Sequence, residues 1–216
     1  MTVSTMLMQL GSGMLKSVEI FCLTLIFSLP LGLLVALGRM SRLKILSGII
    51  KVYIAIMRGT PLMLQLIVVY FAPYYVFGIP ISSGFRFTAV IIAFSVNYAA
   101  YFGEIFRAGI QAIPVGQREA AKILGYSNSQ TFFRIILPQV IKRIIPPVTN
   151  ETITLVKDTS LSFVLSVAEM FTIAKQIGAS MASIMPLMVA GLFYFVFNYV
   201  VAFGMDYFEK KMSYFN

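Results

Sequence analysis

Residues 119–138 read EAAKILGYSNSQTFFRIILP, a polar, helix-favouring stretch in an otherwise apolar chain. Charged side chains within it and beside it make it a poor membrane span: Arg118, Glu119, Lys122, Arg134 and Lys142. It also carries apolar side chains that need a surface to cover them: Ala120, Ala121, Ile123, Leu124, Phe132, Phe133 and Ile136. A docking segment of this kind predicts that the chain transmits something to a partner.

Composition places the rest of the chain in the class of polytopic membrane proteins. Of 216 residues, 59% are hydrophobic and 12% are charged, about half of the roughly 25% charged residues in soluble domains. A bilayer core about 30 Å thick needs roughly 20 apolar residues per helix, so the chain accommodates about five spans. The apolar runs do not alternate as barrel strands do. We therefore expect an all-α protein with a single transmembrane domain over residues 1–216.

The charged residues and the residue types that are missing exclude several functions. The net charge of +9 does not predict nucleic-acid binding, because the basic residues fall between the apolar runs. With no histidine and one cysteine, Cys22, a structural zinc site is excluded. No GxxxxGK[ST] phosphate loop and no Ser/His/Asp set is present. We expect no metal, no cofactor and no enzymatic activity in this chain, so any nucleotide binds to a partner.

Basic residues decide the number of membrane spans. Arginine and lysine follow the first, third and last apolar segments, and the positive-inside rule assigns these three sets to the cytoplasm. This assignment holds only if a less apolar segment, residues 146–167, also crosses the bilayer. We therefore expect the N-terminus outside, the C-terminus in the cytoplasm and a cytoplasmic loop over residues 114–138. The five expected spans are residues 18–37, 61–77, 85–106, 146–167 and 184–205.

Polar residues of the fourth span follow a helical spacing. Four of them lie three, four and four positions apart, which places them on one face of an α-helix: Glu151, Thr154, Asp158 and Ser162. Lys157 lies to the side of that face. Because a charge at the bilayer centre costs about 2.5–3.5 kcal/mol, these side chains are expected to face protein or water. They either line a substrate path, in which a carboxylate and an ammonium bind the two ends of a zwitterion, or form structural ion pairs.

The third span carries a second polar stripe, in which Asn97, Tyr101 and Glu104 are spaced by four and three residues. Asn97 and Tyr101 are further candidates for the substrate path. Glu104 and Arg107, three residues apart near the cytoplasmic end, are expected to pair with each other in a structural or gating role.

Residues 58–61, Arg-Gly-Thr-Pro, predict a break in the second span. Proline favours the first turn of a helix, and Thr60 before it could cap that turn. Arg58 would then lie near the membrane boundary in a structural or gating role; the alternative is a simple kink with an arginine that snorkels to the interface.

Seven positions within residues 119–138 resemble the EAA---G---------I-LP signature of the integral membrane subunits of binding-protein-dependent ABC importers. They are Glu119-Ala120-Ala121, Gly125, Ile135 and Leu137-Pro138. Further segments resemble the polar amino acid permeases, which serve histidine, glutamine, glutamate, arginine, cystine and opines. These segments include RGTPL at 58–62, NYAAY at 97–101, EIFR at 104–107 and KDTSL at 157–161. The resemblance extends over nearly the whole chain.

The resemblance implies the type I ABC importer permease fold and translocation of a polar amino acid across the bacterial plasma membrane. It implies a second permease subunit, identical or similar, two cytoplasmic ATPase subunits that hold ATP and Mg, and an extracellular amino-acid-binding protein. It also implies that residues 119–125 form the coupling helix that docks on the ATPase. Glu119 is expected in its first turn, Ala120 and Ala121 at close contacts, and Gly125 at its end.

One alternative stays open at this point. An ion- or proton-coupled secondary amino acid transporter would use Glu104, Glu151 or Asp158 as proton relays. It would need no nucleotide-binding partner, so dependence on an ATPase separates the two interpretations.

Overall fold

The computed structural model describes residues 2–212, and this part of the chain is helical, without strands. The elements in order are α1 (Val3–Arg39), α2 (Lys44–Gly59), α3 (Leu62–Phe77), α4 (Phe85–Gln111), α5 (Val115–Ile123), α6 (Asn128–Gln130), the π-helical η1 (Thr131–Ile136), α7 (Leu137–Asp158), the 3₁₀-helical η2 (Thr159–Leu165), α8 (Met170–Met181) and α9 (Met185–Met212).

Three of these helices, α1, α4 and α9, are long and apolar enough to cross a membrane. Two further candidates are bent pairs: α2 with α3, which turn by 113°, and residues 128–165 with α8, which turn by 58°. The described chain thus has three spans by this criterion, or up to five if each bent pair acts as one. The all-α prediction is confirmed.

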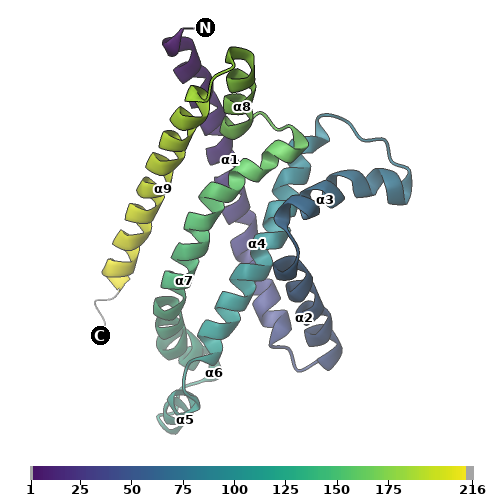
Figure 1. The fold of residues 1–216 in the computed structure, drawn as a ribbon. Coiled ribbons are helices and arrows are strands. Elements are labelled where there is room, and N and C mark those ends of the chain that lie inside the picture. The colour runs from purple at the N-terminus through teal and green to yellow at the C-terminus, as the bar shows by residue number, and fades with distance from the viewer. Residues whose placement is uncertain (1, 213–216) are drawn as a thin grey trace.

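The helices extend beyond the expected spans at several ends. α1 begins at Val3, well before position 18. The polar stretch after α5 is not a loop throughout, because α6, η1 and α7 follow one another from Asn128 without a break. Figure 1 shows α5 and α6 at the same end of the bundle as the α1–α2 connection and the C-terminal end of α9, with α8 and the start of α1 at the other end.

α1 and α4 form the most extensive helix pair, and small residues bring them together. A Cβ atom at Gly32 would lie 2.8 Å from the Cβ of Phe102, and one at Gly103 would lie 2.9 Å from the Cβ of Val35. Close approach through small residues is typical of helix pairs in membranes, where packing rather than water exclusion drives association. This pair anchors a core that also includes Phe94, from α4, and residues of α7.

We expect Gly32→Ala to weaken the α1–α4 contact, because the added methyl group has no room. Overpacking of this kind typically costs 1–3 kcal/mol. Gly191→Ala is the matched control, since a Cβ at that helical position meets nothing within 4 Å. In a thermal-shift assay of the detergent-purified protein, Gly32→Ala should melt several degrees below the parent and Gly191→Ala should not. Equal melting of the two variants would contradict the packing described here.

The carboxylate of Glu169 connects α8 to α1 and α9 by hydrogen bonds. It is fully buried and caps α8, accepting hydrogen bonds from the Phe171 and Thr172 backbone N–H groups at 2.8 and 2.7 Å. It also accepts one from the hydroxyl of Tyr194 in α9 at 2.8 Å and one from that of Ser17 in α1 at 3.3 Å. A buried carboxylate needs such partners. The sequence alone indicates no role for this acid, because it lies between two of the expected spans.

Candidate functional site

An open cavity of about 450 Å³ gathers residues from both polar stripes and from the α2–α3 break. Arg58 comes from the end of α2, Tyr101 and Glu104 from α4, and Glu151 from α7. Arg143 of α7 lines the same cavity. Side chains of opposite charge, more than 90 positions apart in the sequence, therefore share one space between three helices.

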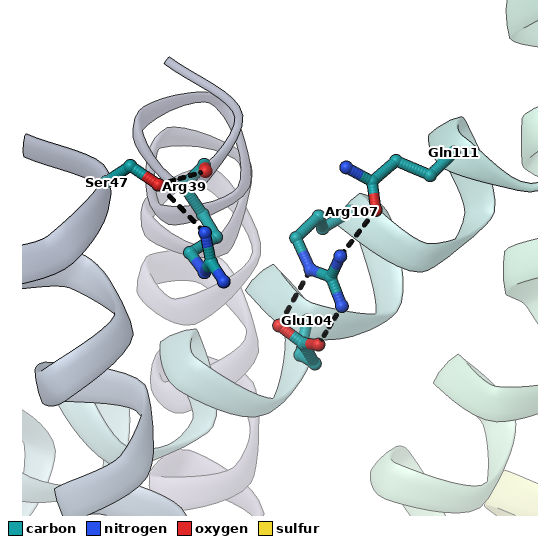
Figure 2. A network of polar contacts seen from close by, with 5 residues as sticks. All are labelled: Arg39, Ser47, Glu104, Arg107 and Gln111. Carbon is teal, nitrogen blue, oxygen red and sulfur yellow. Dashed lines mark hydrogen bonds and ion pairs between the residues drawn. The ribbon is translucent and has the colours of Figure 1, made fainter. Parts of the chain in front are cut away.

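The two acids that line the cavity, Glu104 and Glu151, differ in their bonding partners. The guanidinium of Arg107 donates to both carboxylate oxygens of Glu104, and it also donates to Gln111 (Figure 2). The expected Glu104–Arg107 pair is thus present. Figure 2 also shows Arg39, which donates to the hydroxyl of Ser47 at 2.8 Å and so ties the end of α1 to α2.

Glu151, by contrast, forms no ion pair with any other residue of the described chain. The nearby Arg58 places its guanidinium 5.2 Å from the centroid of the Tyr101 ring, a cation–π contact. The structural pairing of Glu151 with Arg58 or Lys157 that the sequence allowed does not form. A half-buried carboxylate that lines a cavity and has no ion-pair partner in the described chain is available to bind a cation from outside.

Asp158 lies against α4 and has a partner that the sequence analysis missed. The hydroxyl of Tyr98 donates to Asp158 Oδ2 at 2.8 Å, and Tyr98 is almost fully buried. Tyr98 follows Asn97 in the NYAAY segment. Nothing in the sequence indicates whether Tyr98 or Tyr101 contacts α7. The contact joins α4 to the last residue of α7.

The remaining members of the fourth-span stripe do not face the cavity. Thr154 is exposed, and its hydroxyl donates to the Asn150 carbonyl at 2.9 Å within α7. Ser162 is buried and donates to the Thr159 carbonyl at 2.8 Å. The expected α-helical register does not extend to Ser162, because the chain tightens into the 3₁₀ helix η2 after Asp158 and its side chains rotate differently. Lys157 is exposed.

Asn97 supports the break between α2 and α3. Its side-chain amide donates to the Met57 carbonyl at 3.0 Å and to Gln65 Oε1 at 2.9 Å. Gln65, which the sequence analysis did not select, donates in turn to the carbonyls of Met57 and Thr60, at 3.0 and 3.2 Å. The orphan carbonyls at the end of α2 are therefore bound by two amide side chains.

The break at residues 58–61 is confirmed, but the cap assigned to Thr60 is wrong. Pro61 takes the position before α3, and the Thr60 hydroxyl donates backwards to the Ile56 carbonyl at 2.8 Å. Because the chain turns sharply here, the hydroxyl reaches the end of α2 rather than the start of α3.

The segment expected to form a coupling helix is a short helix, α5, that ends as the sequence predicts. Gly125 follows it in a left-handed conformation, at φ 79°. The N–H of Gly125 donates to the Lys122 carbonyl at 3.1 Å, and that of Tyr126 to the Ala121 carbonyl at 3.0 Å, the pattern of a Schellman motif. Glu119 is not in the first turn, because α5 begins four residues earlier at Val115.

Much of the surface of α5 is exposed. Ala121 is buried, whereas Glu119, Ala120 and Gly125 are exposed. Ile123 and Leu124 are 87% and 73% exposed. A cavity of about 390 Å³ lies beside them, between α5 and η1, and its lining includes charged and aromatic side chains: Arg118, Glu119, Lys122, Tyr126 and Phe132. Exposed apolar side chains on a charged helix are typical of a protein contact.

The family model and the relatives most similar in sequence point to the same family. Residues 28–214 match the model of the "Binding-protein-dependent transport system inner membrane component" family. The chain is 40% identical over 170 residues to the L-cystine transport system permease protein TcyB of Bacillus subtilis, covering 79% of this chain and 71% of that protein. It is 37% identical over 205 residues to the arginine transport system permease protein ArtQ of the same organism, covering 93% and 91%.

Solved structures match over nearly the full length. One chain from the crystal structure of an amino acid ABC transporter with histidines superposes with a TM-score of 0.86 at 32% identity, covering 98% of this chain and all of that one. A chain of the inward-facing MetNI methionine ABC transporter superposes with a TM-score of 0.76 at 18% identity, covering 98% and 99%, which shows the shared fold. The type I importer permease fold is thus confirmed.

Proposed function

The chain belongs to the family of binding-protein-dependent transport system inner membrane components, and from this premise we propose that it is the permease subunit through which an ABC importer moves a polar amino acid into the cell. The observation that carries the proposal is α5, an exposed helix at one end of the bundle that holds the EAA signature and ends at Gly125. The relatives named as cystine and arginine permeases support an amino acid as the cargo.

The partner at α5 is a cytoplasmic ATPase subunit that holds ATP and Mg. Ile123 and Leu124 expose apolar surface outside the apolar spans, where lipid does not cover them. The chain has no phosphate loop of its own. An extracellular amino-acid-binding protein delivers the cargo at the opposite end, where α8 and the start of α1 lie, and a second permease subunit completes the membrane part.

The distribution of charge supports an orientation with the N-terminus outside and the C-terminus in the cytoplasm. Figure 1 places the end of α1, the helix α5 and the end of α9 at the same end of the bundle. These segments carry the three basic sets that follow the first, third and last spans. Their gathering at one end is what the positive-inside rule requires.

The cavity between α2, α4 and α7 is the cargo's path on this side of the membrane. Arg58 is placed to bind the α-carboxylate of a zwitterion, and Glu151 to bind its α-ammonium. Tyr101 adds an aromatic wall. Asp158, bound by Tyr98 at 2.8 Å, continues the acidic side of the path along α7. The lining carries two acids, Glu104 and Glu151, and two arginines, Arg58 and Arg143, a balance that suits a zwitterion.

A structural connection between the ATPase contact at α5 and the cavity runs through the segments that follow α5 in the chain. α6, η1 and α7 form a continuous helical segment from Asn128, and the same segment carries Glu151 and Asp158. Ile136 and Val140 pack on Ile113, just after the end of α4, so the segment is also in contact with the end of α4. Docking and release at α5 would in this way change the spacing of α4 and α7, the two helices whose side chains line the path.

The comparisons do not support the secondary transporter. The relatives are permease proteins of binding-protein-dependent systems, and Glu104, one of the proposed proton relays, is already held by Arg107. Affinity purification of the tagged chain from its own membranes tests the assignment. An ATPase with a phosphate loop should copurify in near-equal amount, and a permease that is active in uptake without one would contradict it.

We expect Gly125→Asp to lower ATP-driven uptake at least tenfold, a loss of about 1.4 kcal/mol in coupling. Gly125→Asn is the matched control. Both side chains tolerate the left-handed conformation better than most, and a Cβ at Gly125 meets nothing within 4 Å of this chain. Aspartate alone adds a charge where the ATPase docks. Radiolabel uptake by membranes with equal amounts of permease measures the effect, and full uptake by the aspartate variant would contradict the assigned contact.

A further inference from the structure

The side chains of α2 divide among three faces of the helix. One face turns inward: Ile54 is buried, and the hydroxyl of Tyr53 donates to the Val96 carbonyl of α4. A second face is exposed and apolar: Ile45, Ile49, Val52 and Ile56. The third carries every charged side chain of α2 together with a serine: Lys44, Ser47, Lys51 and Arg58. At 3.6 residues per turn these four positions fall within an arc of about 60°, and they form the cationic stripe of α2.

The cationic stripe runs along the side of α2 that faces the candidate site. Arg58, at the end of α2, lines the cavity of about 450 Å³. Ser47 donates to the Arg39 carbonyl and accepts from the Arg39 guanidinium, at 2.8 Å in both bonds, and Figure 2 shows this contact across from Glu104. The charges of Arg39 and Arg58 both act on the Glu104 carboxylate. Because Lys51 lies between Ser47 and Arg58 on the stripe, it borders the space that leads from the cavity to the end of α1.

Lys51 is a cation without a partner of its own. It is exposed and forms no ion pair with another residue between positions 2 and 212. It lies about 10 Å along the helix from Arg58 and about as far from Lys44, where α2 begins. α2 and α3 together are long and apolar enough to act as one bent span. An ammonium within such a span is costly in lipid and needs water or an anion beside it.

The cationic stripe offers positive charge alone. The sequence has no acidic residue between Glu19 and Glu104, so neither α2 nor α3 supplies a carboxylate to Lys51. In the cavity, by contrast, Arg58 shares the space with Glu104 and Glu151. A group that moves from the cavity along the stripe therefore meets cations only, and the chemistry that matches them is a carboxylate. Lysine suits a transient contact of this kind, because its flexible ammonium is a point charge without the fixed fork of arginine.

We propose that Lys51 is a second binding point for the α-carboxylate of the cargo, on the cytoplasmic side of Arg58. The inference rests on the proposed function, and it extends the cargo path from the cavity toward the cytoplasm. The carboxylate passes from Arg58 to Lys51, a step of about 10 Å along α2, while the α-ammonium leaves Glu151. Successive weak sites let a bound solute leave, whereas one strong site would retain it.

Chemical labelling tests whether Lys51 faces water. In a Cys22→Ser background, Lys51→Cys places a single cysteine on the cationic stripe, and Ile49→Cys places one on the exposed apolar face, on the opposite side of the helix. The purified importer complex is reconstituted into vesicles and exposed on both sides to the membrane-impermeant sulfonatoethyl methanethiosulfonate, and mass spectrometry reads the label on the permease chain. The cysteine at 51 should react at least about tenfold faster, since only a water-exposed thiol ionises readily. Equal or slower reaction at 51 would overturn the proposal.

Uptake by the same vesicles tests whether the ammonium binds the cargo. Lys51→Gln should lower the maximal rate of ATP-driven uptake by about tenfold, the effect of losing one hydrogen bond to a charged group, and Lys51→Arg should retain most of it. Lys211→Gln is the matched control, because it removes an exposed lysine from the same end of the bundle. On Lys51→Cys, the aminoethyl reagent restores an ammonium and should restore uptake, whereas the sulfonatoethyl reagent should not. A structural role for the side chain would not follow the sign of the added charge.

Lipid phosphate is the competing anion, and vesicle composition separates it from the cargo. The loss in Lys51→Gln should be the same in phosphatidylcholine alone and with phosphatidylglycerol added. A loss confined to the anionic vesicles would assign Lys51 to a lipid headgroup and overturn the proposal, as would parent-like uptake by Lys51→Gln. In both cases the parent still transports, so the importer assignment stands. Absence of ATP-driven uptake by the parent complex would instead count against the proposed function itself.

Discussion

Ile123→Glu should abolish ATP-driven uptake without harming the permease itself. The side chain is 87% exposed in the single chain, so a carboxylate there costs the fold little. In the complex it would be buried against the ATPase, where anchor residues of an interface are typically worth 2 kcal/mol or more. The expected loss of coupling is therefore at least about 30-fold in apparent affinity for the ATPase. Copurification of the ATPase and uptake of labelled amino acid, measured side by side, report it.

Ile123→Leu is the control for this variant, because it keeps the apolar contact and nearly the same volume. It should copurify the ATPase and transport as the parent does. If Ile123→Glu kept both the ATPase and uptake, α5 would not be the docking helix, and the exposed apolar residues at its end would need another partner.

Glu151→Gln should weaken recognition of the cargo. The carboxylate lines the cavity without an ion pair in the described chain, and the change keeps its shape while removing its charge. A hydrogen bond to a charged group is worth about 1.5–3 kcal/mol, which corresponds to a loss of roughly 10- to 150-fold in affinity. Concentration-dependent uptake should show the change, while the ATPase still copurifies.

Thr154→Val is the control for this variant, and two further variants test the second acid. Thr154→Val lies one turn away on α7, where the hydroxyl bonds only to its own helix, and it should transport normally. Asp158→Asn and Tyr98→Phe test the second acid. If Asp158 serves only to hold Tyr98, the two variants should behave alike; if it also meets the cargo, Asp158→Asn should change the preference among arginine, glutamine, histidine and cystine and Tyr98→Phe should not. Unaltered uptake in Glu151→Gln would remove the cavity from the path.

Local chemistry made part of this structure predictable. Glycine in a left-handed turn ends α5 at Gly125, and Arg-Gly-Thr-Pro breaks the second span, because both effects depend on residues next to one another. The pairing of Glu104 with Arg107 is likewise local, since positions three apart share a helix face. The membrane class follows from composition alone.

The residues that the sequence missed depend on how distant helices cross. Tyr98 meets Asp158 across 60 positions, and Gln65 meets Asn97 across 32, so neither contact has a spacing that could reveal it. Ser162 left the expected face because the helix changes its pitch after Asp158. Glu169 stood in an expected connection, yet its helix cap is buried between α1 and α9.

Helical continuity gives the proposed mechanism its physical basis. A flexible loop between the coupling helix and the next span would absorb motion, whereas the segment from Asn128 to Asp158 is helical throughout. The π-helical turn η1 lies at the start of this segment, beside the cavity that adjoins α5. Under this proposal, movement at α5 would reach Glu151 through the turn at residues 124–127, the contacts of α5 with η1 and the helical segment that follows.

Uptake by the reconstituted complex tests the central claim most directly. Proteoliposomes containing the chain and its copurified ATPase, with Mg-ATP inside and a loaded amino-acid-binding protein outside, should accumulate labelled amino acid. Omission of ATP or of the binding protein should reduce accumulation to the background level, and a pH gradient should not replace ATP. Accumulation by the chain alone, driven by a proton gradient without nucleotide, would contradict the assignment of this protein as the permease of an ATP-driven importer.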